Sequence, residues 1–334
     1  MPEKLPFNEV VAAARDFVSK DLKSAEAEVA RVAQNAPSQE LSKRITTVTD
    51  RPGKRIRSTL MFLLGRTGGK NYCLESAARA AASIELVHTA SLLHDDVIDD
   101  TEMRRGQKTA HERWGNRMAV LVGDYLLSRG LLTAVDAEAF DLLKLTSRAV
   151  KEMSEGELLQ IEKARRLDIT EEVYFEIIRR KTASLIAACC ACGAASAGGD
   201  ADQVDVMWKF GEKTGLAFQI KDDLLDLGDG KRTGKPTGQD IREKKLTLPL
   251  IHTLQVADGN ARRRLIKLVK RAPKDPEAVR EVMDAILNGP GLKYAREKMM
   301  MLRNEAVEIL NDFEEGDAKN ALIDMLDFTI QRNK

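Results

Sequence analysis

Two short acidic motifs with the same spacing are the residues best suited to chemistry in this chain. Both read DDxxD, the first at Asp95–Asp99 and the second at Asp222–Asp226. On a helix, residues three and four apart share one edge, so the carboxylates of each motif lie close together. A hard divalent cation relieves their repulsion, and carboxylate oxygens that leave room for water and phosphate suit Mg²⁺. The candidate Mg²⁺ ligands are Asp95, Asp96, Asp99, Asp222, Asp223 and Asp226.

Apolar residues flank both acidic motifs. A single motif of this kind is also typical of a solvated helix face, because aspartate is usually exposed. The flanks here are Leu92, Leu93, Val97 and Ile98 around the first motif and Ile220, Leu224, Leu225 and Leu227 around the second. Burial of these flanks directs the carboxylates toward an internal cavity, where two facing clusters require cations between them. The pair of motifs therefore predicts a site for Mg²⁺ and a diphosphate.

Basic residues, which a diphosphate also needs, lie near both motifs. A helix start that combines backbone N–H groups with basic side chains suits an anion. For any one of these residues a solvated surface charge is the ordinary interpretation, so the prediction depends on their clustering. The candidates are Lys54, Arg55 and Arg57 in the segment GKRIR, then Arg104, Arg105, Lys181 with Thr182, Gln219, Lys221, Lys235, Lys244 and Lys245.

The segments that carry these residues read as helices. Of the 334 residues, 43% are hydrophobic and only 4% aromatic, and Ala, Leu, Glu, Lys and Arg are frequent, which favours helix over sheet. We expect helices near residues 7–33, 54–64, 74–99, 114–133, 137–163, 171–197, 202–226 and from 245 onward, with a Gly-rich loop at 228–239. No segment alternates with period two, so an all-α protein is predicted. No linker separates two cores, which predicts one domain over residues 1–334.

The charge and composition exclude several classes of partner. Lys and Arg number 53 and Asp and Glu 52, and a net charge of +1 gives no general attraction to nucleic acid. The first residues lack the apolar core of a signal peptide, and no stretch reaches the roughly 18 uncharged apolar residues that span a bilayer. We therefore expect a soluble, cytoplasmic protein. Cys189, Cys190 and Cys192 lack the CxxC spacing of a zinc site, and are interpreted as buried small residues.

In combination, these motifs resemble those of the trans-isoprenyl diphosphate synthases, the polyprenyl synthetase family. The resemblance covers nearly the whole chain. It is carried by GKRIR at 53–57, HTASLLHDDVIDD at 88–100, MRRG at 103–106, LVGDYLL at 121–127, KTASLI at 181–186, FQIKDDLLD at 218–226 and GKPTGQDIREKKLTLP at 234–249. It implies an all-α, isoprenoid synthase-type helical bundle around a deep central cavity, with the two acidic motifs facing each other.

The resemblance also implies roles for single residues. The six aspartates would bind Mg²⁺ and the allylic diphosphate, and Arg104, Lys181, Gln219 and Lys235 would hold the same substrate. Isopentenyl diphosphate would be held by Lys54, Arg57, His88 and Arg105. Thr182 and Lys245 would support the ionising centre. The family usually has Gly-Lys where this chain has Lys244-Lys245, which changes the residue at the first position of that pair.

The predicted reaction is ionisation followed by condensation. Basic residues and Mg²⁺ would neutralise the leaving diphosphate, and the double bond of isopentenyl diphosphate would attack the allylic cation. The departing diphosphate is a plausible base, because no histidine or carboxylate stands out for proton removal. A cavity that excludes water protects the cation. Turnover is therefore expected to depend on both acidic motifs.

The residues before the first acidic motif bear on product length. In the family, a bulky aromatic residue four or five positions before the motif stops chain growth, whereas this chain has the small residues Ala90 and Ser91. Val87 and Ile84 continue the same direction, and about 16 Å of helix separates Ile84 from Asp95 at 1.5 Å per residue. Leu127 and Leu131 are candidates for a deeper floor. We expect a medium-to-long product, above geranylgeranyl, and a geranylgeranyl diphosphate synthase is the alternative. The other interpretation of Ala90 and Ser91 is that they only allow close helix packing.

Two other functional classes stay open from the sequence. A terpene cyclase of similar fold carries a second metal motif that mixes Asn, Ser and Glu and needs no isopentenyl diphosphate site. A non-catalytic partner subunit tends to lose the acidic motifs, both of which are present here. The family commonly forms homodimers through helix packing, and the Leu-rich segment 119–133 is a candidate interface.

Overall fold

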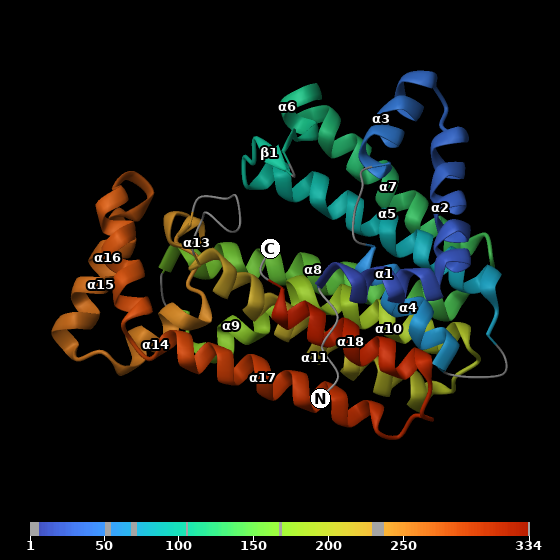
Figure 1. Cartoon of the computed structure of the whole chain (residues 1–334). Coiled ribbons are helices and arrows are strands. Elements are labelled where there is room, and N and C mark those ends of the chain that lie inside the picture. The colour runs from blue at the N-terminus through green and yellow to red at the C-terminus, as the bar shows by residue number, and fades with distance from the viewer. Residues whose placement is uncertain are drawn as a thin grey trace. The chain divides into compact units, whose positions relative to one another are not determined.

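The structure is a computed structural model that describes residues 7–50, 55–67, 72–104, 106–166, 169–228 and 237–332. Within them nearly all regular structure is helical (Figure 1), which confirms the all-α prediction. An antiparallel hairpin of β1 (Met103–Arg104) and β2 (Gln107–Lys108) is the exception, and the sequence analysis missed it. The chain divides into two compact units, each described below by itself; the single domain stays a prediction.

Unit 1 comprises Met1–Val150, Ala187–Trp208 and Phe313–Leu322. Its buried apolar residues include a cluster contributed by four helices, α2, α3, α5 and α7, together with Ala110. The helices that lie wholly in this unit are α1 (Phe7–Phe17), α2 (Ser19–Gln34), α3 (Gln39–Thr49), α4 (Ile56–Thr67), α5 (Leu74–Ile98), α6 (Ala110–Trp114) and α7 (Asn116–Val135).

Helices α5 and α7 lie side by side in unit 1 (Figure 1). Small residues allow this contact: a Cβ added to Gly130 would lie 3.0 Å from the carbonyl oxygen of Ser83 and 3.2 Å from a methyl carbon of Val87. The Ser83 hydroxyl donates a hydrogen bond of 2.7 Å to the Gly130 carbonyl. The close packing fixes the helix that ends in the first acidic motif against its neighbour.

Unit 2 comprises Lys151–Ile186, Lys209–Asp312 and Ile323–Lys334. Wholly within it lie α9 (Glu171–Ile178), the π-helix η1 (Arg179–Ala183), α13 (Gln239–Arg242), α14 (Leu248–Val256), α15 (Gly259–Arg271), the 3₁₀-helix η2 (Ala272–Lys274), α16 (Pro276–Leu287) and α17 (Gly291–Leu310). Four longer helices contribute residues to both units: α8 (Phe140–Arg166), α10 (Ser184–Ser196), α11 (Ala201–Asp226) and α18 (Asp317–Gln331).

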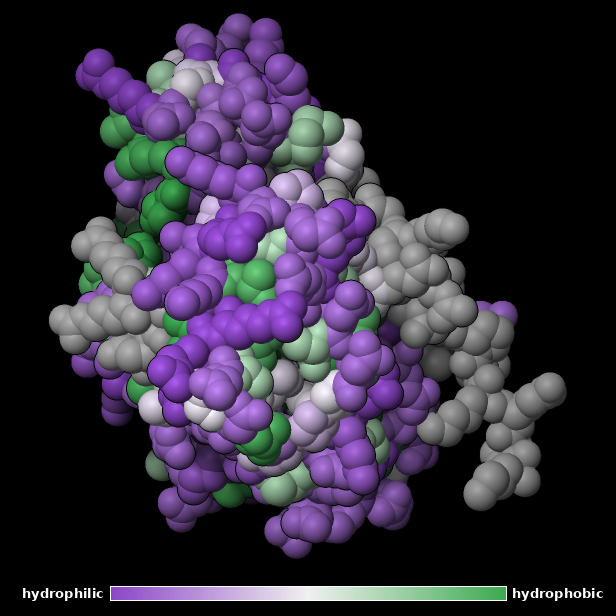
Figure 2. Space-filling model, turned by 90° about the vertical axis from the view of Figure 1, so that its left-hand side faces the viewer, coloured by the Kyte–Doolittle hydropathy of each residue, from purple (hydrophilic) through white to green (hydrophobic). Residues whose placement is uncertain are grey.

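Helix starts in unit 2 follow local sequence rules. The Asp258 carboxylate accepts hydrogen bonds from two backbone N–H groups at the start of α15, and Asp275 does the same for α16. Both helices are amphipathic, with Leu265, Leu268 and Val269 of α15 buried. Hydrophilic side chains dominate the face that Figure 2 turns to the viewer, the side of the molecule on which α15 and α16 lie in Figure 1.

Several predicted helix boundaries differ from the structure. The pattern at 7–33 divides into α1 and α2, and α3 was not predicted at all. The segment 171–197 was predicted as one helix, but it contains α9, η1 and α10 in succession. Most of the predicted Gly-rich loop lies outside the described residues.

The expectations about the cysteines and about membrane-spanning segments concern helices α10 and α7. The three cysteines of α10 are buried, and burial raises the pKa of each thiol. Among the described helices, α7 is the one whose length and composition would allow it to cross a membrane. Core helices of soluble proteins have the same composition, and α7 packs against α5.

Candidate active site

The first acidic motif occupies the last turn of α5. Asp96 is buried, and one of its carboxylate oxygens accepts a hydrogen bond of 2.8 Å from Arg104 Nε. Asp95 is half-buried and Asp99, at the C-terminal cap, is exposed. The next residue, Asp100, has φ of +51°, which ends the helix. The structure thus places Asp96 against the protein, while Asp95 and Asp99 reach solvent.

The β1–β2 hairpin positions Arg104. Arg104 pairs with Gln107 in the hairpin, and its guanidinium forms an ion pair of 2.8 Å with Asp96. Arg104 was predicted as a basic partner of the diphosphate, but the hairpin was not predicted, because two-residue strands are too short to show alternation. The neighbouring candidate Arg105 lies outside the described residues.

Arg57 and His88 lie next to each other in unit 1. The Nη1 atom of Arg57 on α4 lies 3.0 Å from Nε2 of His88 on α5. The Arg57 Nε atom is buried and has no hydrogen-bond partner among the described residues. The structure therefore brings together two of the residues predicted for isopentenyl diphosphate, whereas Lys54 lies outside the described residues.

A contact between α5 and α7 beside the first acidic motif was missed from the sequence. His94 precedes Asp95, and a Cβ added to Gly123 would lie 2.3 Å from the His94 Nε2 atom. The same ring nitrogen lies 3.3 Å from an Asp124 carboxylate oxygen. The Gly-Asp pair of the LVGDYLL segment thus seats the His94 ring, a role that its sequence spacing did not reveal.

The residues predicted to set product length lie on different sides of α5. Ala90 belongs to the buried cluster with α2, α3 and α7, as do its helix neighbours Leu86 and Leu93. Val87 and Ile84 are also buried. Ser91 is half-buried, and its hydroxyl donates to the His88 carbonyl over 2.9 Å. Ser91 is thus the half-buried member of this set, one turn before Asp95.

The second acidic motif occupies the last turn of α11, in unit 2. The Asp222 side chain is 42% exposed, and it forms an ion pair of 2.6 Å with Arg332, the residue that follows α18. Asp226 accepts hydrogen bonds of 3.1 Å from the backbone N–H groups of Gln239 and Asp240, which begin α13. Burial raises the pKa of Asp226. Within this motif, Asp222 and Asp226 are half-buried and Asp223 is buried.

Asp223, between these two, is buried. It accepts hydrogen bonds from the Tyr174 hydroxyl, 2.7 Å, and from Gln219 Nε2, 2.9 Å. Burial, and then the charge of Asp240, raise the pKa of Asp223. Asp240 itself has its pKa raised to about 7, mainly by burial and secondly by the charge of Asp226. Neither Tyr174 nor Asp240 was predicted from the sequence as a site residue.

Lys181 and Thr182 lie in the π-helix η1. Lys181 forms an ion pair with Glu157 of α8, and the Thr182 hydroxyl donates to Gln219 Oε1 over 2.9 Å. A Cβ added to Gly156 would lie 2.6 Å from the backbone nitrogen of Lys181. A Cβ added to Gly215 would lie 2.5 Å from the Cα atom of Ala183. The wide turn of η1 therefore fits closely between glycines of two neighbouring helices.

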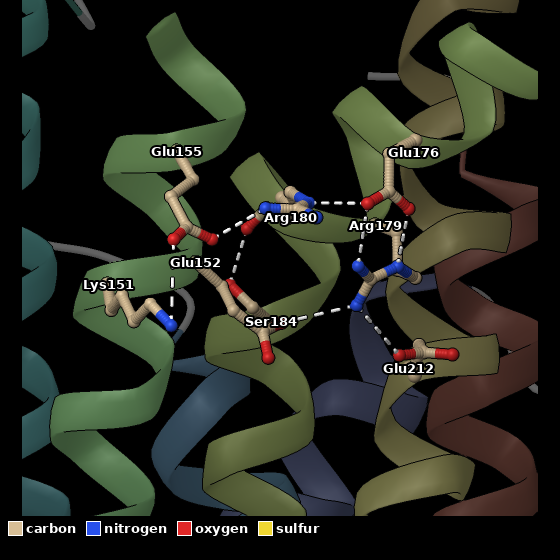
Figure 3. Close-up of polar contacts among 8 residues, drawn as sticks. All are labelled: Lys151, Glu152, Glu155, Glu176, Arg179, Arg180, Ser184 and Glu212. Carbon is tan, nitrogen blue, oxygen red and sulfur yellow. Dashed lines mark hydrogen bonds and ion pairs between the residues drawn. The ribbon is translucent and has the colours of Figure 1, made fainter. Parts of the chain in front are cut away.

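Ion pairs fix the beginning of η1 (Figure 3). Arg179 contacts Glu176, Glu152 and Glu212, at 2.9, 3.3 and 3.7 Å. Arg180 contacts Glu155 and Glu176, and its carbonyl accepts from the Ser184 hydroxyl. Because these acidic residues come from α8, α9 and α11, the backbone that presents Lys181 is held from three sides.

A pocket of about 160 Å³ collects the predicted residues of unit 2. Lys245 lies at it and forms an ion pair of 2.6 Å with Glu243. Its neighbour Lys244 has φ of +57°, the left-handed conformation that glycine adopts without strain. The residues with polar side chains that line the pocket are Gln160, Tyr174, Lys181, Thr182, Gln219, Asp223, Asp240, Lys245 and Thr247. Lys235 lies outside the described residues.

The carboxylates of the two motifs fit a hard divalent cation by their chemistry. Asp99 is exposed and Asp95 and Asp222 are half-buried, which suits Mg²⁺, because this ion keeps water and phosphate oxygens among its ligands. Asp96, Asp223 and Asp226 already accept hydrogen bonds from the protein. In the part of the chain that the structure describes, no three His, Cys, Asp or Glu side chains converge as a ready-made metal cage.

Comparison with known proteins identifies the family. The polyprenyl synthetase family profile matches residues 38–286. Over 285 residues the chain is 38% identical to a short chain isoprenyl diphosphate synthase of Methanothermobacter thermautotrophicus, covering 84% of this chain and 86% of the relative. Over 283 residues it is 34% identical to octaprenyl diphosphate synthase of Escherichia coli, covering 84% and 87%. A polyprenyl synthase structure from Caulobacter crescentus, complexed with calcium and isoprenyl diphosphate, has a TM-score of 0.88 at 30% identity, covering 97% of this chain and 98% of that chain.

The all-α fold and the paired acidic motifs, seen beside these relatives, define an enzyme that transfers prenyl groups between diphosphates. The chain belongs to the polyprenyl synthetase family and is a polyprenyl diphosphate synthase. Enzymes of this family use divalent metals, with isopentenyl and allylic diphosphates as substrates.

Proposed function

We propose that this enzyme condenses isopentenyl diphosphate with geranyl, farnesyl or geranylgeranyl diphosphate to give a medium-to-long all-trans polyprenyl diphosphate. The observation that carries the proposal is the retention of both DDxxD motifs, each with an accessible first aspartate, Asp95 and Asp222. A non-catalytic partner subunit would have no need for either motif, and a terpene cyclase would have no need for the Arg57–His88 pair.

Mg²⁺ is the proposed metal, and its proposed ligands are the carboxylates of Asp95, Asp96 and Asp99 in the first motif and of Asp222, Asp223 and Asp226 in the second. When bound, it would neutralise charge on the leaving diphosphate. Lys181, Lys245 and Arg104 add fixed positive charge for the same diphosphate. The Thr182 hydroxyl and the Gln219 amide are dipoles at the pocket of unit 2, where the allylic cation is proposed to form. Arg57 and His88 orient isopentenyl diphosphate. No protein side chain is assigned as the base, and the released diphosphate is proposed to take the proton.

The proposed product is longer than geranylgeranyl diphosphate. Support comes from Ser91, which is small and half-buried one turn before Asp95, where an aromatic side chain would obstruct a growing chain. Ala90 packs in the core of unit 1, so its small size also serves helix packing. The alternative product is geranylgeranyl diphosphate, which the similarity to a short chain synthase keeps open.

We also propose that the enzyme is a cytoplasmic homodimer. Four of the exposed residues of α7 are apolar, Val120, Leu121, Leu132 and Val135, and they form a stripe that the exposed polar residues Asp124 and Ser128 interrupt. A second copy of the chain would cover this stripe and remove it from water. Light scattering of the purified enzyme tests the proposal, and a monomer at micromolar concentration would contradict it.

The reaction is tested with Asp95→Ala and Asp222→Ala. Each variant is expected to fold and to lose turnover by about a hundredfold to a thousandfold, because removal of one charge-stabilising group costs about that much. The measurement is incorporation of labelled isopentenyl diphosphate with Mg²⁺ present. Asp136→Ala, at an exposed aspartate that follows α7, is the control and is expected to retain turnover. Near-normal turnover in both motif variants would overturn the proposal.

A further inference from the structure

The Tyr174 hydroxyl is buried against the second acidic motif. Tyr174 lies on α9 and is 4% exposed, and its ring belongs to the apolar core of unit 2 with Ile178 and Leu216. The hydroxyl leaves this apolar surrounding to donate a hydrogen bond of 2.7 Å to Asp223. A phenylalanine would pack the same core equally well, so the hydroxyl requires an explanation of its own.

Asp223 has each of its carboxylate oxygens bonded to a neutral donor. Oδ2 accepts from Tyr174 and Oδ1 accepts from Gln219 Nε2, at 2.7 and 2.9 Å. A buried carboxylate that depends on two neutral donors is strongly oriented by them, because loss of either leaves an oxygen unsatisfied. The preceding residue, Asp222, instead forms an ion pair with Arg332 and is partly exposed to solvent. The two adjacent aspartates therefore have different environments.

The hydrogen bonds continue from Asp223 to the π-helix. The Gln219 amide donates to Asp223 and its carbonyl oxygen accepts from the Thr182 hydroxyl at 2.9 Å, so both ends of this amide are occupied and its orientation is fixed. The resulting series, Tyr174 to Asp223 to Gln219 to Thr182, joins α9, α11 and η1. The ion pairs of Figure 3 hold the start of η1, and this series holds the residues that follow.

We propose that Tyr174 is a positioning residue for prenyl transfer, which holds Asp223 and, through it, the Gln219 amide and the Thr182 hydroxyl in their reactive orientation. The inference rests on the proposed function of this site. Tyr174 lines the pocket of unit 2, and its hydroxyl contacts Asp223. Its effect passes through Asp223, in the way that partners behind a metal-site carboxylate orient it and tune its affinity.

The test is Tyr174→Phe, which removes one oxygen atom and keeps the ring. Loss of such an orienting partner typically costs about 10- to 100-fold in activity or metal affinity, so kcat is expected to fall by about that factor. Calorimetry with Mg²⁺ and inorganic diphosphate is expected to show weaker binding, by about tenfold. Both readouts are compared with the wild-type enzyme at equal Mg²⁺, beside the thermal midpoint of each variant.

Two other tyrosines supply matched controls. The Tyr72 hydroxyl donates over 2.6 Å to Asp21, a fully buried carboxylate of unit 1, and the Tyr294 hydroxyl donates to Glu171 in unit 2. Tyr72→Phe loses the same kind of bond in unit 1, and Tyr294→Phe loses one to Glu171, which lies on α9 one turn before Tyr174 and so controls for a disturbance of that helix. The kcat and diphosphate affinity of both variants are expected to stay within about twofold of wild type, because neither hydroxyl bonds to the acidic motif. If Tyr174→Phe lowers only the thermal midpoint, as Tyr72→Phe does, Tyr174 is a core residue and the inference is wrong.

A double-mutant cycle with Thr182→Val tests the series itself. If the four residues act as one unit, the double variant loses little more diphosphate affinity than the worse single variant, because each change already disorders the unit. Fully additive losses would show that Tyr174 and Thr182 act separately and would overturn the inference. An inactive wild-type enzyme that binds diphosphate with Mg²⁺ would instead count against the proposed function, since the binding cycle does not depend on turnover.

Discussion

Lys244 adopts a backbone conformation that its side chain disfavours. Its φ of +57° lies in the left-handed region, at the position where the resemblance to the family predicts glycine. The turn after α13 therefore keeps the shape that a glycine would allow, although the residue has changed. Adjacent Lys245 remains at the pocket of unit 2, so the substitution preserves the location of the predicted functional lysine.

Lys244→Gly is expected to stabilise the enzyme. Glycine removes the strain of the left-handed backbone, which is worth about 1–2 kcal/mol. Glycine also gives the unfolded chain more freedom, which offsets part of this, so the free energy of unfolding should rise by about 0.5–1 kcal/mol. Urea unfolding measures it. Lys244→Ala, which keeps the strained φ, serves as the comparison and should show no gain; equal gains in both variants would refute the backbone explanation.

Single residues differ in how far the sequence reveals them. The DDxxD motifs were predictable because their members are three and four positions apart, a spacing that places them together on any helix. Tyr174 was not, because it lies 49 positions before its partner Asp223, and only the packing of α9 against α11 brings them together. The different environments of Asp222 and Asp223 were also hidden, since adjacent aspartates look equivalent in sequence.

At the scale of elements, the π-helix η1 is the feature that presents Lys181 and Thr182. Short π-helical turns are frequent at functional sites. The segment before and after it has an ordinary helical pattern, so the sequence predicted one continuous helix. Its wider turn depends on partners that come from elsewhere in the chain, Gly156 of α8 and Gly215 of α11, together with the ion pairs of Figure 3.

Gly215→Ala is expected to displace η1. The new Cβ would lie 2.5 Å from Ala183 Cα, a backbone atom that cannot move aside alone. Overpacking of this kind costs roughly 1–3 kcal/mol of stability. Turnover should fall by about tenfold or more, since misplaced catalytic groups lose rate steeply.

Gly259→Ala is the control for this substitution, because a Cβ there meets nothing within 4 Å. It should leave turnover unchanged and stability equal or slightly higher. Unfolding midpoints and steady-state rates of the two variants provide the comparison, and a Gly215→Ala enzyme with normal kcat would mean that the position of η1 does not limit the reaction.

The ion pair between Glu176 and Arg179 makes the stability of η1 depend on pH. The hydrogen bond from Arg179 lowers the pKa of Glu176 from 4.5 to about 2. The folded protein therefore favours the charged carboxylate, so the stabilisation is complete above pH 4.5 and is lost as the pH falls toward about 2.

Glu176→Gln should thus lower the free energy of unfolding at pH 7, by about 1 kcal/mol after allowance for solvent screening of this partly exposed pair. Below pH 4.5 the difference from wild type should shrink. Denaturant titrations at several pH values measure it, and a difference that does not change with pH would show that the charge of Glu176 is not what stabilises η1.

At the scale of the whole molecule, the all-α class was predictable, but the short elements and the division into two compact units were not. Low aromatic content and the absence of period-two alternation sufficed to exclude a large sheet. The β1–β2 hairpin and α13 were too short for any periodic signal, and α3 follows α2 with only a few residues between them. The two compact units arise from contacts between segments far apart in sequence, which composition does not record.

Product length is also a property of the whole molecule. Two relatives of similar identity, 38% and 34%, are a short chain synthase and an octaprenyl diphosphate synthase, so overall similarity does not select a length. Length is expected to follow from the residues beside the growing chain, of which Ser91 is the half-buried candidate before Asp95.

Product sizing with the purified enzyme tests the central claim most directly. The enzyme is incubated with farnesyl diphosphate, excess isopentenyl diphosphate and Mg²⁺, and the products are dephosphorylated and separated by chain length. Prenyl alcohols longer than geranylgeraniol, formed only when Mg²⁺ is present, are the predicted result. Geranylgeranyl diphosphate as the sole product would contradict the assigned length, and no consumption of isopentenyl diphosphate would contradict the reaction itself.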